Sequence, residues 1–292
     1  MGRSMLVALT VALATLGPAP AASPVAKGSA RLEIETCRGE LAVFTYKPAT
    51  YRDGPLIVVF HGVLRNAEEY RDHARALAER HGAIVVAPHF PDPPFSIERY
   101  QKGGLVIDGQ TQPLESCTWW AVPDIVAEIR RREARPDMPY YFIGHSGGGQ
   151  FLIRLAGFVK TDVARIVIAN PGTYLRTSHD SPYPFGFGGL PKELSNDATL
   201  QRFLAQPITL YLGAKDLERD EHLDVTKWGE AQGRTRFERG NNAFEEAKRL
   251  AAEKGWQFRW RLLIVPDVGH DHEAMFNHAL CQEALFGAKR DE

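Results

Sequence analysis

The chain has 292 residues, a formal net charge of -1, and 44% hydrophobic against 24% charged residues. These proportions are typical of globular proteins and argue against a disordered chain, a collagen-like repeat or a bundle of membrane helices. A net charge so close to zero gives no electrostatic reason to expect a nucleic-acid partner. The length allows one large domain or two small ones, and because no repeat or low-complexity linker divides the chain, we expect a single domain.

The first 22 residues have the layout of a secretory signal peptide. Arg3 precedes an apolar stretch over residues 5–16, and small residues follow as far as Ala22. A short membrane anchor is the alternative, but the apolar stretch falls well below the roughly 20 residues that a spanning helix needs. The sequence therefore predicts removal of residues 1–22, a mature domain over residues 23–292 that is secreted or periplasmic, and no stable membrane insertion.

Three cysteines are present, Cys37, Cys117 and Cys281. An exported chain can form one disulfide from them and leaves one thiol over, which we expect to be buried and inert, and the sequence does not choose among the three pairings. Their wide spacing matches no zinc-binding pattern.

The order of apolar runs along the chain indicates the fold. Partial alternation on either side of Arg38 and Gly39 predicts an antiparallel hairpin at a sheet edge. Six short apolar runs then follow from Pro55 onward: PLIVVFHG, AIVVAPHF, PYYFIGHS, ARIVIANPG, PITLYLGAKD and FRWRLLIVPDVGH. Such runs, rich in β-branched residues, are typical of strands buried on both faces.

Segments with helical spacing separate these runs. The segment NAEEYRDHARALAERHG offers Asn66 as an N-cap and Gly82 as a stop, and VPDIVAEIRRREARP opens with Pro123 and closes before Pro136. Two more are GQFLIRLAGFVK and GNNAFEEAKRLAAEKG. Alternating strands and helices predict an α/β fold, a three-layer sandwich with a mostly parallel sheet and helices on both faces.

Two stretches, near residues 91–120 and 173–206, interrupt the alternation and are rich in Pro, Gly and aromatic residues. Loops of this length in a compact domain are usually functional or disordered, and we expect these to form walls or a cap over a cleft. Their aromatic side chains either line an apolar pocket or pack as ordinary core, and the sequence does not decide between these for Trp119, Trp120, Tyr174, Tyr183, Phe185 and Phe187.

A glycine-rich turn in the third apolar run carries the main functional signal. Residues 144–148 read Gly-His-Ser-Gly-Gly, which matches G-x-S-x-G with a strand before it and a helix after it. The glycines allow a sharp turn that lifts Ser146 above the sheet edge, beside the free N–H groups of the helix. A phosphate-binding turn is the alternative, but the P-loop lysine is missing and the glycine spacing differs.

A serine nucleophile needs a base and an orienting carboxylate, expected in the chain order Ser, Asp or Glu, His. Asp216 follows one predicted strand and His270 follows the last strong one, so both lie at the sheet edge that carries Ser146. Candidates that the sequence makes less favourable are Asp220, Asp224 and His272, while Asp267 and Asp271 fit surface or capping roles.

Acyl transfer also needs N–H donors for the oxyanion. We expect the first at Gly147, directly after the nucleophile, and the second at Val63, with Leu64 as its neighbour, in the turn after His61 and Gly62. For His61 itself we expect a hydrogen bond that fixes this loop.

With these motifs in the same order, the chain resembles an α/β-hydrolase over residues 56–286: the HG loop, the GHSGGG turn, the LGAKD acid turn and the VGH histidine turn. The segment HGVLRNAEEY also resembles secreted polyhydroxyalkanoate-depolymerase-like and feruloyl-esterase-like proteins. The resemblance implies acyl transfer through a serine acyl-enzyme, with no metal and no organic cofactor.

The sequence thus predicts a secreted serine hydrolase that cleaves a small-molecule or polymeric carboxylic ester through Ser146, His270 and Asp216. A serine peptidase or amidase would use the same three residues, and a non-catalytic binding protein could share the scaffold. The substrate stays open because loops set selectivity.

Overall fold

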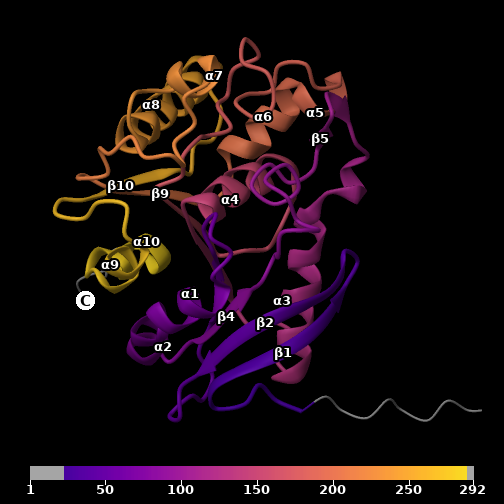
Figure 1. Ribbon diagram of the computed structural model, residues 1–292, viewed down its shortest axis with the longest axis vertical. Helices are drawn as coiled ribbons and strands as arrows, with labels where there is room; N and C mark the ends of the chain where they lie inside the picture. Colours follow the sequence, from indigo (N-terminus) through magenta and orange to yellow (C-terminus); the bar gives the residue numbers. More distant parts are fainter. Residues whose placement is uncertain (1–22, 288–292) are drawn as a thin grey trace, which may run out of the picture.

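The computed structural model describes residues 23–287. The predicted signal peptide, residues 1–22, lies outside the described residues. Within them the dominant feature is an eight-stranded sheet with the order β1-β2-β4-β3-β7-β8-β9-β10 (Figure 1). Its strands are β1 Gly28–Thr36, β2 Gly39–Lys47, β3 Leu56–Phe60, β4 Ile84–Pro88, β7 Tyr140–His145, β8 Arg165–Ala169, β9 Ile208–Gly213 and β10 Arg261–Val265.

The pairing of the strands matches the predicted α/β class. The hairpin β1-β2 forms an antiparallel edge and β2 pairs antiparallel with β4, whereas every pairing from β4 through β3, β7, β8 and β9 to β10 is parallel. All six predicted apolar runs are strands of this parallel part, and β3, β4 and β9 are buried along their whole length.

Helices cover both faces of the sheet and form the outer layers. One face packs against α3 Ala121–Arg132, α4 Gly147–Phe158, α6 Asp197–Leu204 and α8 Arg236–Lys254. The other packs against α1 Ala67–His73, α2 Arg75–His81, α9 His272–Asn277 and α10 Leu280–Phe286. Along β3 the side chains alternate between the two cores, since Val58 belongs to the first and Ile57 and Val59 to the second. The predicted three-layer α/β sandwich is confirmed.

The helix expected between Asn66 and Gly82 is two helices. It is interrupted at Ala74, which separates α1 from α2, and Asn66 makes no capping hydrogen bond to the backbone. Gly82 ends α2 in the left-handed conformation, with φ 56°. This confirms the prediction that the helix stops at Gly82. α3 begins at Ala121, two residues before Pro123, and α8 begins at Arg236, ahead of the predicted segment.

The two predicted insertions carry short elements. The first contains the hairpin of β5 Val106–Ile107 and β6 Gln110–Thr111 and two 3₁₀ turns, Leu114–Ser116 and Thr118–Trp120. The second contains α5 Lys192–Ser195 and α6. Of the six aromatic side chains named from the sequence, four are buried in the core: Trp119, Tyr174, Tyr183 and Phe187.

Two further features of the described residues bear on the sequence predictions. Cys37, Cys117 and Cys281 are all free thiols, the first exposed and the other two buried, so none of the three possible disulfides is formed in this structure. Between residues 23 and 287, no helix has the length and apolar character needed to cross a membrane. A short helix, α7 Lys227–Glu230, precedes α8.

Candidate active site

The turn between β7 and α4 holds Ser146 in a strained backbone conformation. Its φ is 54° and its ψ is -117°, a region that non-glycine residues rarely occupy. The turn is secured at both sides, because Ser146 N donates to Ala169 O at 2.9 Å and Gln150 N donates to Ser146 O at 3.0 Å. The strain is concentrated at the one residue whose hydroxyl the turn presents.

Close packing explains the glycines around this serine. A Cβ added to Gly148 would lie 2.1 Å from Phe60 O, and one added to Gly144 would lie 2.5 Å from Gly148 C. Both contacts are with backbone atoms that cannot yield locally. Glycine is therefore required for α4 to start this close to β3 and β7.

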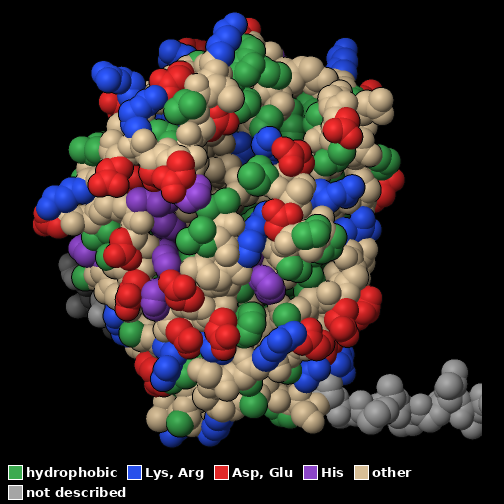
Figure 2. Space-filling model, in the orientation of Figure 1, with side chains coloured by type: hydrophobic (Ala, Val, Ile, Leu, Met, Phe, Trp, Pro, Cys, Tyr) green, Lys and Arg blue, Asp and Glu red, His purple; other side chains and the backbone are tan. Residues whose placement is uncertain are grey.

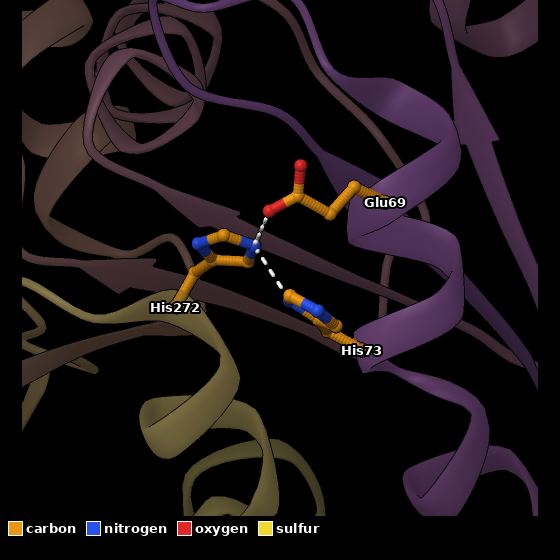
Figure 3. Close-up of side chains that lie close together, drawn as sticks. All are labelled: Glu69, His73 and His272. Atoms are coloured by element: carbon orange, nitrogen blue, oxygen red, sulfur yellow. Dashed lines mark hydrogen bonds and ion pairs between the residues drawn. The ribbon is translucent and has the colours of Figure 1, made fainter.

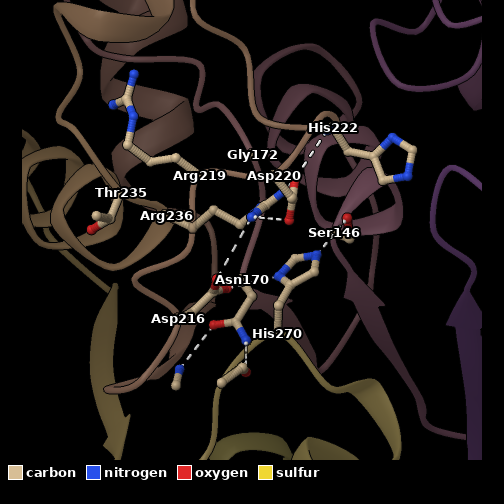
Figure 4. Close-up of polar contacts among 12 residues, drawn as sticks. Ser146, Asn170, Gly172, Asp216, Arg219, Asp220, His222, Thr235, Arg236 and His270 are labelled. Atoms are coloured by element: carbon tan, nitrogen blue, oxygen red, sulfur yellow. Dashed lines mark hydrogen bonds and ion pairs between the residues drawn. The ribbon is translucent and has the colours of Figure 1, made fainter.

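Ser146, His270 and Asp216 lie in one hydrogen-bonded row (Figure 4). His270 Nε2 is 3.0 Å from Ser146 Oγ, and His270 Nδ1 is 2.7 Å from Asp216 Oδ2. The Asp216 side chain is fully buried, whereas the His270 ring is 24% exposed. When Nδ1–H donates to the carboxylate, Nε2 is left as the acceptor for the serine proton, which is the arrangement that general-base activation of a hydroxyl needs.

Parallel strand ends bring these residues together. Asp216 follows the end of β9, and its N–H donates to Gly213 O at 3.1 Å. His270 follows β10 after a short turn. Asn170, just after β8, joins both segments, since its Nδ2 donates to Gly269 O at 3.0 Å and its Oδ1 accepts from Gly213 N at 2.8 Å.

The less favoured carboxylates have other partners. Asp220 pairs with Arg236, and Asp224 Oδ1 accepts from Thr226 N at 2.9 Å. Asp267 pairs with Lys215 on the surface, and Asp271 caps α9 by accepting from Ala274 N. Only Asp216, among these five, contacts His270 through a hydrogen bond that the structure shows.

Arg236 is a buried site residue that the sequence analysis missed. Its side chain is 1% exposed, its guanidinium holds Asp220 at 2.7 and 2.9 Å, and its Nη1 lies 3.7 Å from Asp216 Oδ1. The positive charge stands behind the carboxylate that faces His270. A threonine cap at Thr235, which accepts from Glu238 N, was the available signal that a helix starts beside Arg236.

The predicted oxyanion donors Val63 and Gly147 lie next to each other. A Cβ added to Gly147 would be 3.2 Å from Val63 N. His61 Nδ1 lies 2.9 Å from Gly62 O, and Phe90 N donates to His61 Nε2 at 3.1 Å. Because the C=O and N–H of a trans peptide point in opposite directions, holding Gly62 O toward His61 directs Val63 N–H away from it. The structure thus shows the loop-fixing hydrogen bond expected of His61.

Four histidines lie around the serine. A small pocket of about 130 Å³ at Ser146 is lined by Gly62, Val63, Leu64, Asn66, Tyr70, His145, Ser146, His222, His270 and His272, and Figure 2 shows histidine side chains gathered on this face. Burial lowers the pKa of His272 to about 4 and holds the pKa of His145 well below its usual range.

None of the six aromatic residues named from the sequence lines this pocket at Ser146. A larger hollow, of about 650 Å³, lies beside the amino end of β7.

Comparison with known proteins agrees with the fold. The profile of the alpha/beta hydrolase fold matches residues 55–216. The crystal structure of LpqC, a poly(3-hydroxybutyrate) depolymerase from Bordetella parapertussis, has a TM-score of 0.80 and 31% identity over 88% of this chain and 90% of that chain. Poly(aspartic acid) hydrolase-1 from a Sphingomonas species has a TM-score of 0.81 and 27% identity over 86% and 96% of the two chains.

A more distant structure shares the fold alone. The siderophore hydrolase EstA from Aspergillus nidulans has a TM-score of 0.51 and 14% identity, over 92% of this chain and 96% of that chain. No curated protein matches the chain.

Proposed function

This chain belongs to the alpha/beta hydrolase fold family, and from that premise we propose that it is a serine hydrolase that cleaves carboxylic esters through Ser146, His270 and Asp216. The observation that supports this most strongly is the row of hydrogen bonds from Asp216 Oδ2 through His270 to Ser146 Oγ, at 2.7 and 3.0 Å.

The proposed reaction has two half-cycles. Ser146 Oγ attacks the ester carbonyl while His270 Nε2 takes its proton, and the N–H groups of Val63 and Gly147 stabilise the oxyanion. His270 then protonates the leaving alcohol as the carbonyl–oxygen bond breaks. Water repeats the attack on the acyl-enzyme, releases the acid and restores Ser146. Asp216 keeps the imidazole in the required tautomer throughout.

The surroundings of the pocket support a substrate that lies across the surface. A volume of about 130 Å³ is smaller than the roughly 300–1,000 Å³ of sites that enclose a drug-sized ligand. Loops near the site expose apolar side chains, Leu64 at 72%, Leu217 at 54% and Val225 at 63%. An extended polyester chain fits this shape, and the similarity to LpqC supports the same substrate class. Secretion, predicted from residues 1–22, would bring the enzyme to such a polymer.

Amide hydrolysis is the second candidate. It is favoured by the similarity to poly(aspartic acid) hydrolase-1, whose name states action on a polyamide. The same serine chemistry serves both bonds, and the difference lies in how well the leaving amine is protonated.

Kinetics on matched substrates tests both candidates. We expect turnover of p-nitrophenyl butyrate and clearing of a poly(3-hydroxybutyrate) suspension, with much slower release from peptide anilides or poly(aspartic acid). Ser146→Ala should lower kcat on the order of 10⁴- to 10⁶-fold, whereas Ser29→Ala, exposed on the edge strand β1, should match the wild type. Faster turnover of the amides would favour the second candidate, and activity retained in Ser146→Ala would contradict both.

A further inference from the structure

Three side chains outside the proposed triad meet in a cluster of metal-ligand type (Figure 3). They are Glu69, His73 and His272, and one ligand atom from each lies within 4.8 Å of the other two. His73 Nδ1 is 2.9 Å from His272 Nε2, and His272 Nε2 is 3.7 Å from Glu69 Oε1. The row from Ser146 to Asp216 uses none of these three.

The fold brings the three together from distant parts of the chain. Glu69 and His73 are four residues apart on α1, so both point from the same face of that helix. His272 is the first residue of α9, which packs beside α1. A bound ion would therefore connect two helices separated by about 200 positions in the sequence.

The donor atoms suit a divalent transition metal such as Zn²⁺. Zinc takes imidazole nitrogen and carboxylate oxygen at about 2.0–2.2 Å in tetrahedral sites, so two of its ligand atoms are separated by roughly 3.3 Å. The observed separations of 2.9 and 3.7 Å lie on either side of that value. Two imidazole nitrogens approach this closely when they share either one proton or one metal ion.

Neighbouring contacts hold the ligand rings in place. The His272 ring stacks on Tyr70 with centroids 3.9 Å apart and planes 6° apart. Asn277 Nδ2 donates to His73 O at 3.2 Å and ties α9 to α1. Glu273 lies 3.5 Å from His73 Nε2, the ring nitrogen that faces away from His272. A carboxylate there can orient a ligating histidine, as second partners of metal-bound histidines do.

We propose that Glu69, His73 and His272 form a binding site for Zn²⁺ or a similar transition-metal ion. The Glu69 side chain is 50% exposed, so water can reach the ion and complete its coordination. The ion takes no part in the ester chemistry. It fixes α1 to α9 and so restrains the segment that directly follows His270.

Zinc titration of the metal-free full chain tests the site. Isothermal titration with Zn²⁺ alone should give one site per chain, and Co²⁺ in its place should give the intense visible absorption of a tetrahedral complex. The thermal unfolding midpoint should rise when Zn²⁺ is added. Glu69→Gln, His73→Gln and His272→Gln should each weaken binding at least tenfold, and Glu273→Gln by about 10- to 100-fold. His179→Gln, an exposed histidine far along the chain, should bind as the wild type does.

Folding of the variants is checked by their circular dichroism and midpoint without metal. Should a histidine variant fail to fold, Glu69→Gln, at an exposed position, carries the test. The proposal is overturned if the wild type takes up no Zn²⁺ at micromolar concentration, which would leave only a hydrogen bond between the rings. It is equally overturned if uptake persists unchanged in Glu69→Gln and His73→Gln, or depends instead on His270 or Cys37.

Discussion

His61 is buried beneath the turn after β3, with its ring fully shielded from solvent. Nδ1–H donates to Gly62 O, which leaves Nε2 to accept from Phe90 N. A second proton on Nε2 would face the N–H of Phe90 and abolish that bond. Burial lowers the pKa of His61 from its ordinary value of about 6.5 to about 3.

This pKa makes stability depend on pH. Between pH 6.5 and 3 the unfolded chain binds a proton at His61 and the folded chain does not, so the free energy of unfolding falls as pH falls through that window. Within this window His61 contributes a slope of about 1.4 kcal/mol per pH unit. Above pH 6.5 this slope vanishes, and the stability that neutral His61 provides is fully present. Urea unfolding at several pH values from 7 to 5 measures the slope.

His61→Gln supplies the comparison, because it removes this one imidazole and leaves every other titratable group in place. We expect the variant to be less stable than the wild type at pH 7. Its free energy of unfolding should also depend less steeply on pH, with a slope smaller by about 1.4 kcal/mol per pH unit. His179→Gln should keep the wild-type slope. Equal slopes in the wild type and His61→Gln would show that the folded protein protonates His61 freely.

At the scale of elements, the first turn of α8 supports the candidate site from behind. Arg236 lies there, buried against Asp216 and Asp220. Removing one partner of a buried ion pair leaves an uncompensated charge and costs about 3–5 kcal/mol. Because Asp216 is proposed to orient His270, the loss of Arg236 should also slow the reaction.

We expect Arg236→Gln to lower kcat at least tenfold while KM changes little, since a displaced carboxylate disturbs the imidazole rather than substrate binding. Arg236→Lys should recover part of the loss. Arg249→Gln serves as the control on the same helix, where an exposed pair with Glu253 contributes only about 0–1 kcal/mol. Steady-state kinetics and urea unfolding measure both effects; an unchanged kcat in Arg236→Gln would contradict a positioning role.

The strands and the order of candidate residues were predictable because their signals are local. Each apolar run ends where a parallel strand ends, and Ser146, Asp216 and His270 each follow such an end. Their side chains lie within hydrogen-bonding distance, and their catalytic roles stay predictions. The serine turn was readable because G-x-S-x-G is a short local pattern between a strand and a helix, although the contact that excludes a side chain at Gly148 is with Phe60 O of β3.

Features that depend on tertiary packing were not predictable. The break between α1 and α2 falls at Ala74, which is neither glycine nor proline, so residue type does not mark it. Arg236 reads in the sequence as one of several arginines in a polar segment, and only the fold buries it. The aromatic residues of the insertions could not be divided between core and pocket, because aromatic side chains are common both in buried cores and in the walls of ligand pockets.

At the scale of the whole molecule, the start of the described chain is attached to α3. Val25 N donates to Glu133 Oε1 at 2.9 Å, and Arg132 Nη1 donates to Ser23 O at 3.3 Å. A domain that begins at Ser23 therefore keeps these contacts. The boundary after residue 22 and export both stay predictions.

Expression of the complete chain in a bacterial host tests the boundary. We expect the periplasm or medium to contain a protein whose first residue is at or near Ser23, identified by N-terminal sequencing and intact mass. A chain that lacks residues 1–22 should fold but stay in the cytoplasm. Recovery of the complete chain, with residues 1–22 attached, from the membrane fraction would instead support the anchor alternative.

The proposed function requires Ser146 to be a nucleophile activated by His270. Labelling with a fluorophosphonate, followed by intact mass and peptide mapping, measures this directly. We predict one adduct per chain, located on Ser146, absent in Ser146→Ala and formed far more slowly in His270→Gln. An unlabelled wild type, or equal labelling of Ser146→Ala, would contradict it.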